Sequence, residues 1–193
     1  MDLLARRHWV FDMDGTLTVA AHDFDAIRAE LGLPPGPILE SLDAMPADEA
    51  ARLHARLEVI EEGIAQRAKP QPGAASLLDH LHGAGARLGV VTRNKRRLAH
   101  ITLAAAGLGA FFDPQDVLGR DEAPHKPSPA GIQLLLGSWE ASPTDAVMVG
   151  DYLFDLQAGR AAGTATVLFD VSGAYAWAEH ADRCVRRLDA LLG

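Results

Sequence analysis

The stretch Phe11-Asp12-Met13-Asp14-Gly15-Thr16-Leu17 determines how the rest of this chain is interpreted. A short β-like run ends at Phe11, and two carboxylates follow with one residue between them. Gly15 then permits a sharp turn. Two acids at a strand end, with a turn starting between them, can bracket one reaction centre. Taken alone, such a pair is more often a strand end with a solvated Asp-Gly turn.

Four further β-like runs follow the first, at residues 88–91, 116–118, 146–149 and 165–169. The runs 88–91 and 146–149 are continuously apolar, which is typical of strands buried on both faces of a parallel sheet. Helical patterns lie between them, from Gly73 to Gly83, over residues 95–106, after Pro129 and over residues 155–163. This alternation predicts an α/β fold with a Rossmann-like, doubly wound parallel sheet.

One region, residues 18–69, contains no convincing strand. Helices are expected over residues 23–31 and 46–68, and the second carries an apolar stripe that includes Leu53 and Leu57. We interpret residues 18–69, the cap segment, as a small helical cap inserted after the first strand. Residues 1–17 and 70–193 then form the α/β core.

The composition excludes several classes of protein. The 193 residues suggest one domain, or one domain with a modest insert. The formal net charge of −8 argues against nucleic-acid or anionic-membrane partners. The single cysteine cannot form an internal disulfide or a cysteine zinc cage. Without a signal-like or membrane-spanning apolar run, a cytoplasmic protein is the expectation.

Two more motifs follow predicted strands. In Thr92-Arg93-Asn94, a hydroxyl followed by backbone N–H groups at a helix start can bind an anion, or Thr92 or Asn94 can simply cap the helix. Lys126 stands before a proline that restricts its backbone, so it can serve as a fixed counter-charge for phosphate. The alternative for Lys126 is a solvated loop lysine.

The last motif is Gly150-Asp151 with Asp155 four residues from the first acid. Carboxylates in such a cluster suit Mg²⁺, although they can also be a turn residue and a helix cap. Because the carboxyl ends of parallel strands converge on one edge, these acids should meet Asp12 and Asp14 there. Crowded carboxylates need a cation, which a divalent metal and Lys126 would supply. This constellation suits phosphoryl transfer.

The order of these motifs resembles the haloacid dehalogenase superfamily, and the cap segment looks like a short C1-type cap of its phosphoglycolate phosphatase-like members. The resemblance implies that Asp12 is the nucleophile and becomes an aspartyl-phosphate. It implies that Asp14 is the general acid and base. It also implies that the Asp12 carboxylate and the Asp14 backbone carbonyl bind Mg²⁺.

The remaining roles also come from the resemblance. Thr92, with the backbone N–H of Arg93 or Asn94, is expected to bind the phosphoryl oxygens. Lys126 is expected to bridge nucleophile and phosphate. Asp151 matches a further Mg²⁺ ligand, and Asp155 matches an acid that supports the metal through water or Lys126.

The sequence therefore predicts a Mg²⁺-dependent phosphatase for a small phosphate monoester. The alternatives are a phosphomutase of the beta-phosphoglucomutase type and a non-catalytic phosphometabolite sensor. The expected partner is a small phosphorylated metabolite, with no nucleic acid or membrane, and the protein is expected to be a monomer or weak homodimer. The candidates for substrate contact are basic side chains of two regions. In the cap segment they are His22, Arg52, Arg56, Arg67 and Lys69, and near Thr92 they are Arg93 and Arg96.

Overall fold

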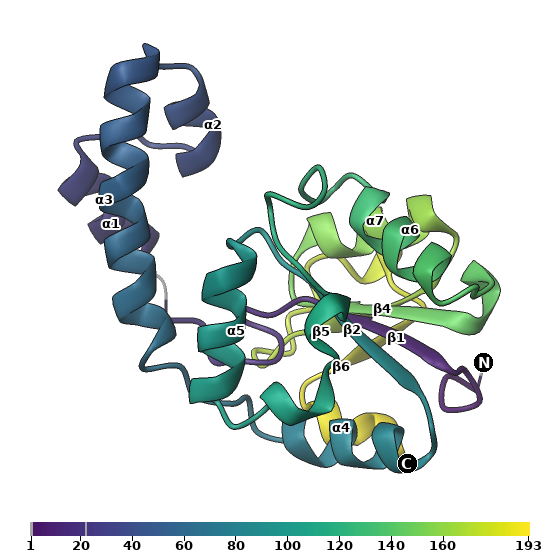
Figure 1. The fold of residues 1–193 in the computed structure, drawn as a ribbon. Coiled ribbons are helices and arrows are strands. Elements are labelled where there is room, and N and C mark those ends of the chain that lie inside the picture. Colours follow the sequence, from purple (N-terminus) through teal and green to yellow (C-terminus); the bar gives the residue numbers. More distant parts are fainter. Residues whose placement is uncertain (1, 22) are drawn as a thin grey trace.

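A computed structural model describes residues 2–21 and 23–193 of the chain. Its centre is a six-stranded parallel sheet with the strand order β3-β2-β1-β4-β5-β6 (Figure 1). The strands are β1 (His8–Phe11), β2 (Arg87–Val91), β3 (Val117–Leu118), β4 (Ala146–Gly150), β5 (Ala165–Phe169) and β6 (Arg183–Val185). The predicted α/β fold with a doubly wound parallel sheet is confirmed.

Helices cover both faces of the sheet. On one face, α4 (Ala74–Gly83) and α5 (Arg96–Ala105) pack on Trp9 and Phe11 in a large apolar cluster. On the other face, α6 (Ala130–Ser138) and α7 (Leu153–Ala162) pack in the cluster that contains Val10. Alternate residues of β1 therefore serve opposite layers, as the period of a strand requires. Figure 1 shows the two helical layers on either side of the sheet.

The strand order changes direction at β1. The chain adds β2 and β3 on one side of β1 and then continues with β4 on its other side. Phe11 lies beside Val90 of β2 and Val149 of β4, so the three strands end at nearly the same level. In open α/β sheets, such a switch point at the carboxyl ends of the strands is where ligands bind.

The remaining helices are those of the cap segment and a set of short 3₁₀ turns. In the cap segment, α1 (Phe24–Leu31), α2 (Ile38–Asp43) and α3 (Ala47–Ala65) share their own apolar cluster. Five 3₁₀ turns complete the described chain: η1 (Gly109–Phe111), η2 (Pro114–Asp116), η3 (Pro143–Asp145), η4 (Ala178–His180) and η5 (Leu188–Leu192). Over residues 2–21 and 23–193, no helix is both long and apolar enough to cross a bilayer.

Two connections join the cap segment to the sheet and run side by side. The Val19 N–H donates to the Lys69 carbonyl at 2.9 Å, and the Gln71 N–H donates to the Leu17 carbonyl at 2.9 Å. Figure 1 shows α1–α3 projecting away from the sheet layers. The division into a core of residues 1–17 and 70–193 and a cap of residues 18–69 stays a prediction.

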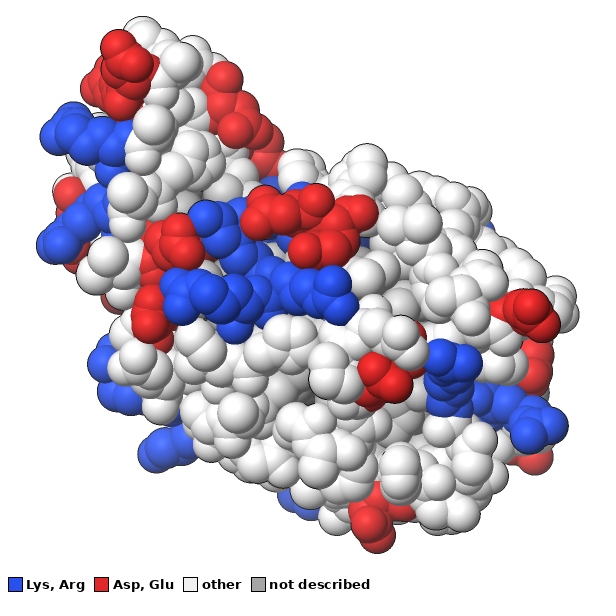
Figure 2. All heavy atoms as spheres, viewed as in Figure 1, with Lys and Arg blue, Asp and Glu red and all other residues white. Residues whose placement is uncertain are grey.

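Ion pairs connect α3 to α5. Glu58 contacts Lys95 at 2.6 Å and Arg97 at 3.1 Å, and Glu62 contacts Arg97 at 2.8 Å. Cations at the amino end of a helix oppose its dipole, so the α3 carboxylates compensate an unfavourable arrangement at the start of α5. In Figure 2, blue and red side chains gather where the projecting helices meet the sheet domain. The orientation of α3 on α5 is therefore set partly by charge.

We expect Gly89→Ala to lower the free energy of unfolding by about 1–3 kcal/mol, because it overpacks the contact between β2 and α6. A Cβ atom at Gly89 would lie 2.8 Å from both Leu135 Cδ1 and Trp139 Cζ2. Gly83→Ala is the matched control, since a Cβ there meets no atom within 4 Å. Urea denaturation measures both variants, and equal stability of the two would contradict this packing.

Candidate active site

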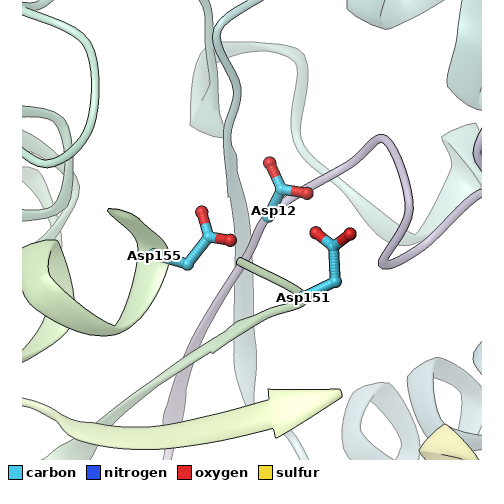
Figure 3. Close-up of side chains that lie close together, drawn as sticks. All are labelled: Asp12, Asp151 and Asp155. Atoms are coloured by element: carbon cyan, nitrogen blue, oxygen red, sulfur yellow. The ribbon is translucent and has the colours of Figure 1, made fainter. Parts of the chain in front are cut away.

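Three carboxylates meet at the switch point of the sheet. Asp12 follows β1, and its N–H continues the pairing by donating to the Val149 carbonyl at 2.9 Å. Asp151 follows β4, and Asp155 lies in the first turn of α7. Oxygen atoms of the three side chains lie within 4.8 Å of one another, and Figure 3 shows the carboxylates converging from these elements.

Glycines allow this close approach. Gly15 has a φ of 91°, and a Cβ there would lie 2.3 Å from Asp151 Oδ2. A Cβ at Gly150 would lie 2.2 Å from Asp155 Cβ. The Thr16 hydroxyl donates to Asp151 Oδ1 at 3.2 Å, which fixes that carboxylate against the loop. Any side chain at either glycine would therefore push the acids apart.

Lys126 is buried among the acids. Its Nζ lies 2.5 Å from Asp12 Oδ1 and 2.7 Å from Asp155 Oδ1. Burial acts to lower the pKa of Lys126, but the charges and hydrogen bonds of Asp12 and Asp155 outweigh it and raise the pKa above its usual value. The ammonium is therefore charged and holds β1 to the start of α7.

One lysine does not neutralise this group of acids. Burial and the Asp12 charge raise the pKa of Asp151 to about 8. Burial raises the pKa of Asp155 to about 6, against the lowering effect of Lys126. A cluster of carboxylate oxygens with only one lysine to balance it fits a hard divalent cation. The acids thus form a group that could bind a metal.

The loop after β2 contacts Asp14, the second carboxylate of the motif that follows β1. The Asn94 N–H donates to Thr92 Oγ1 at 3.1 Å, which leaves the Thr92 hydroxyl proton for an incoming oxygen. The Asn94 side-chain amide donates to Asp14 Oδ2 at 3.0 Å. Burial and the Asp12 charge raise the pKa of Asp14 to about 7. From the sequence, Asn94 was expected to bind phosphate through its backbone N–H or to cap a helix, and the structure adds this side-chain contact with Asp14.

Arg93 turns towards the cap segment. Its Nη2 lies 2.6 Å from Glu40 Oε1, and its guanidinium lies over the Phe154 ring at 5.8 Å from the ring centre. The Arg93 side chain therefore belongs to the outer part of the site. The expected contact of its backbone N–H with phosphate stays a prediction.

A cavity of about 810 Å³ extends from the acids to the cap segment. All eight predicted site residues line this cavity, namely Asp12, Asp14, Thr92, Arg93, Asn94, Lys126, Asp151 and Asp155. The structure thus brings together residues that four separate motifs contributed. Their individual roles in catalysis stay predictions.

The basic residues suggested for substrate contact are mostly elsewhere. Arg52, Arg56, Arg67 and Lys69 are not among the described residues that line the cavity, and Arg56 pairs with Glu30. His22 lies outside the described residues. Arg96 donates to the Pro114 carbonyl at 2.8 Å.

Two other arginines, Arg28 and Arg120, line the cavity instead. Arg28 pairs with Asp25 three residues away, a spacing that is visible in the sequence. Arg120 contacts Glu61, which is 59 residues away, through both of its terminal nitrogens. No local pattern marks the second pair, so only the fold could reveal it.

Comparisons with known proteins agree with the fold and identify the family. Residues 21–169 match the haloacid dehalogenase-like hydrolase family. A haloacid dehalogenase-like hydrolase domain-containing protein of Arabidopsis thaliana is 32% identical over 86% of this chain and 71% of its own length. A phosphoglycolate phosphatase of Pseudomonas savastanoi is 31% identical over 82% of this chain and 67% of its own length.

Solved structures agree as well. A crystal structure of a hydrolase from Pseudomonas syringae superposes with a TM-score of 0.79 over 97% of this chain and 96% of that one, at 23% identity. This likeness concerns the fold. The family match covers more than half of the chain and includes Thr92, Lys126 and Asp151. The chain therefore belongs to the haloacid dehalogenase-like hydrolase family, as its motifs predicted, and it is an enzyme with phosphatases among its relatives.

Proposed function

We propose that this protein is a Mg²⁺-dependent phosphatase that hydrolyses a small organic phosphate monoester through an aspartyl-phosphate on Asp12. The observation that carries the proposal is the buried contact of Lys126 with Asp12 at the floor of the cavity. A carboxylate held by an ammonium is positioned for attack. The same ammonium can stabilise the negative charge of a phosphoryl group.

The first half of the reaction transfers the phosphoryl group to the protein. An oxygen of Asp12 attacks phosphorus, and the bond from phosphorus to the leaving oxygen breaks. Asp14 donates its proton to that oxygen, so the product leaves as a neutral alcohol. The Asn94 amide at 3.0 Å from Asp14 Oδ2 holds this carboxyl group in place.

The second half releases inorganic phosphate. Asp14, now a carboxylate, takes a proton from water as the water oxygen attacks phosphorus, and the bond to Asp12 breaks. Thr92 and Lys126 hold phosphoryl oxygens throughout. The chain then returns to its starting state, with Asp14 protonated and Asp12 ionised.

Asp12, Asp151 and the Asp14 backbone carbonyl are the ligands that we propose for Mg²⁺. Both oxygens of Asp155 are already engaged, Oδ1 with Lys126 at 2.7 Å and Oδ2 with the Tyr152 N–H at 3.0 Å. Asp155 therefore supports the site through Lys126. When bound, Mg²⁺ supplies positive charge to the phosphoryl oxygens.

We expect Asp12→Asn to lower phosphate release by about a thousandfold or more, because the amide cannot act as the nucleophile. Phosphate release from a panel of phosphorylated metabolites, with and without Mg²⁺, measures the effect, and circular dichroism checks that the variant folds. Full activity in this variant would contradict the proposal.

The unaltered protein separates the alternative functions. If it hydrolysed esters slowly but catalysed rapid isomerisation when primed by a bisphosphate, the phosphomutase would replace the phosphatase. Silence in both assays would favour the sensor.

We expect Mg²⁺ at about 100 times its dissociation constant to stabilise the protein by about 2.7 kcal/mol, or roughly 5–10 °C in Tm. Asp151→Asn should abolish this response. It should also raise the Tm of the metal-free protein, because it removes one of the crowded carboxylates.

Asp79→Asn is the matched control for the metal response, since Asp79 is an exposed acid on α4. Its response to Mg²⁺ should equal that of the unaltered protein. Differential scanning calorimetry with and without Mg²⁺ measures all three proteins. An undiminished shift in Asp151→Asn would remove Asp151 from the proposed metal site.

A further inference from the structure

The outer part of the cavity is apolar and partly aromatic. On the cap side, its walls come from α1, α2 and α3, and on the other side they come from the start of α7. The apolar residues that line it include Phe24, Ile27, Ile38, Leu57, Tyr152 and Phe154. Phe24 and Tyr152 are 57% and 48% exposed, and they are two of the large apolar side chains that lie at the surface. Aromatic surface is therefore open to solvent on both walls of the cavity.

The aromatic wall on the core side is braced by its own contacts. Tyr152 packs edge-on against Phe154 at 5.1 Å and against Trp177 at 4.6 Å between ring centres. Arg93 lies over Phe154, which further fixes that ring. These rings follow directly after Asp151, so a group bound against them is adjacent to the acids. The wall is thus supported by contacts within the core and continuous with the proposed phosphate site.

The arginines in the outer cavity are already neutralised by protein carboxylates. Arg28 pairs with Asp25 and donates to the Gly36 carbonyl at 3.2 Å. Arg93 pairs with Glu40 at 2.6 Å.

The third arginine is the most enclosed. Arg120 contacts Glu61 at 3.2 Å, and both side chains are about nine-tenths buried. With Asp23 also lining the cavity, the outer part holds three arginines and four acids, namely Asp23, Asp25, Glu40 and Glu61. Among the described residues that line this part of the cavity, there is no surplus of positive charge to attract a second anionic group on a substrate.

We propose that the preferred substrates are phosphate monoesters whose leaving group is uncharged and carries an aromatic ring, which binds between Phe24 and the Tyr152–Phe154 wall. This inference rests on the proposed function, because it concerns the alcohol side of the same cavity. A volume of about 810 Å³ is in the range of sites that enclose drug-sized ligands. Aryl alcohols and nucleosides share the required chemistry, whereas short carboxylate-bearing alcohols do not.

A matched series of esters tests the preference. We expect kcat/KM for benzyl phosphate to exceed that for methyl phosphate by about 10–100-fold, the usual effect of burying one ring. Phosphoglycolate and 4-carboxybenzyl phosphate should both be poorer than benzyl phosphate. Adenosine 5′-monophosphate distinguishes the two sources of the ring: a value above that of benzyl phosphate indicates a nucleoside, and a value below it indicates an aryl alcohol. A preference for methyl phosphate or phosphoglycolate would overturn the proposal.

Glu40→Gln tests the charge argument by gain of function. Releasing Arg93 should raise the ratio of kcat/KM for 4-carboxybenzyl phosphate to that for benzyl phosphate by about tenfold. Glu30→Gln is the control, because Glu30 forms a similar exposed pair with Arg56 away from the cavity. An unchanged ratio in Glu40→Gln, or an equal rise in both variants, would contradict the role of the Arg93–Glu40 pair.

Phe24→Ala tests the ring slot itself. It should lower the ratio of kcat/KM for benzyl phosphate to that for methyl phosphate by about tenfold. Val59→Ala is the control, since Val59 is a 63% exposed apolar residue of α3 that does not line the cavity. Equal ratios in the two variants would remove Phe24 from the slot.

Calorimetry with benzylphosphonate and methylphosphonate separates this inference from the proposed function, because neither compound is hydrolysed. Tighter binding of benzylphosphonate by the unaltered protein, with no hydrolysis of any ester, would keep the ring slot and discard the phosphatase. Hydrolysis of esters together with equal binding of the two phosphonates would keep the phosphatase and discard the ring slot.

Discussion

The ammonium of Lys126, buried between Asp12 and Asp155, is the contact on which the rest of the site depends. It joins the end of β1 to the first turn of α7, two elements that the sheet order brings together at its switch point. A buried charge that loses its partner is strongly destabilising, so the acids and the lysine hold one another in place. Burial and the Asp12 charge raise the pKa of Asp151 to about 8, because the site lacks the positive charge that would stabilise this carboxylate, and this explains why the site is suited to a cation.

Much of this arrangement could be predicted because the carboxyl ends of parallel strands converge. Apolar runs that are typical of buried strands precede Asp12, Thr92 and Asp151. These runs form β1, β2 and β4 in the structure. The local sequence alone did not predict that Lys126 is buried, since a loop lysine before a proline is as compatible with solvent as with burial; only the resemblance to the family placed it beside Asp12. Its position depends on where the segment before α6 crosses the sheet edge, which is a property of the whole fold.

The outer part of the cavity could not be predicted from the sequence. The six-residue α2 and the three-residue β6 are too short for a periodic signal, and neither was predicted. The apolar stripe of α3 indicates which face of that helix is buried, but not that Glu61 reaches Arg120. Pairs such as Arg93–Glu40 and Arg120–Glu61 join residues 53 and 59 positions apart. Arg93 was suggested as a substrate contact but not its pairing with Glu40, and neither Arg28 nor Arg120 was suggested.

These two parts of the cavity obey different physical constraints. At the inner end, a glycine replaced by any larger residue would displace a carboxylate, and a lysine buried among acids tolerates no change of charge. At the outer end, the walls come from short helices with their own apolar cluster, joined to the sheet by two paired connections and by ion pairs at the surface. In the proposed phosphatase, substitutions there would alter the shape and charge around the leaving group without reaching Lys126. Selectivity in this chain can therefore change while the chemistry at the sheet edge stays fixed.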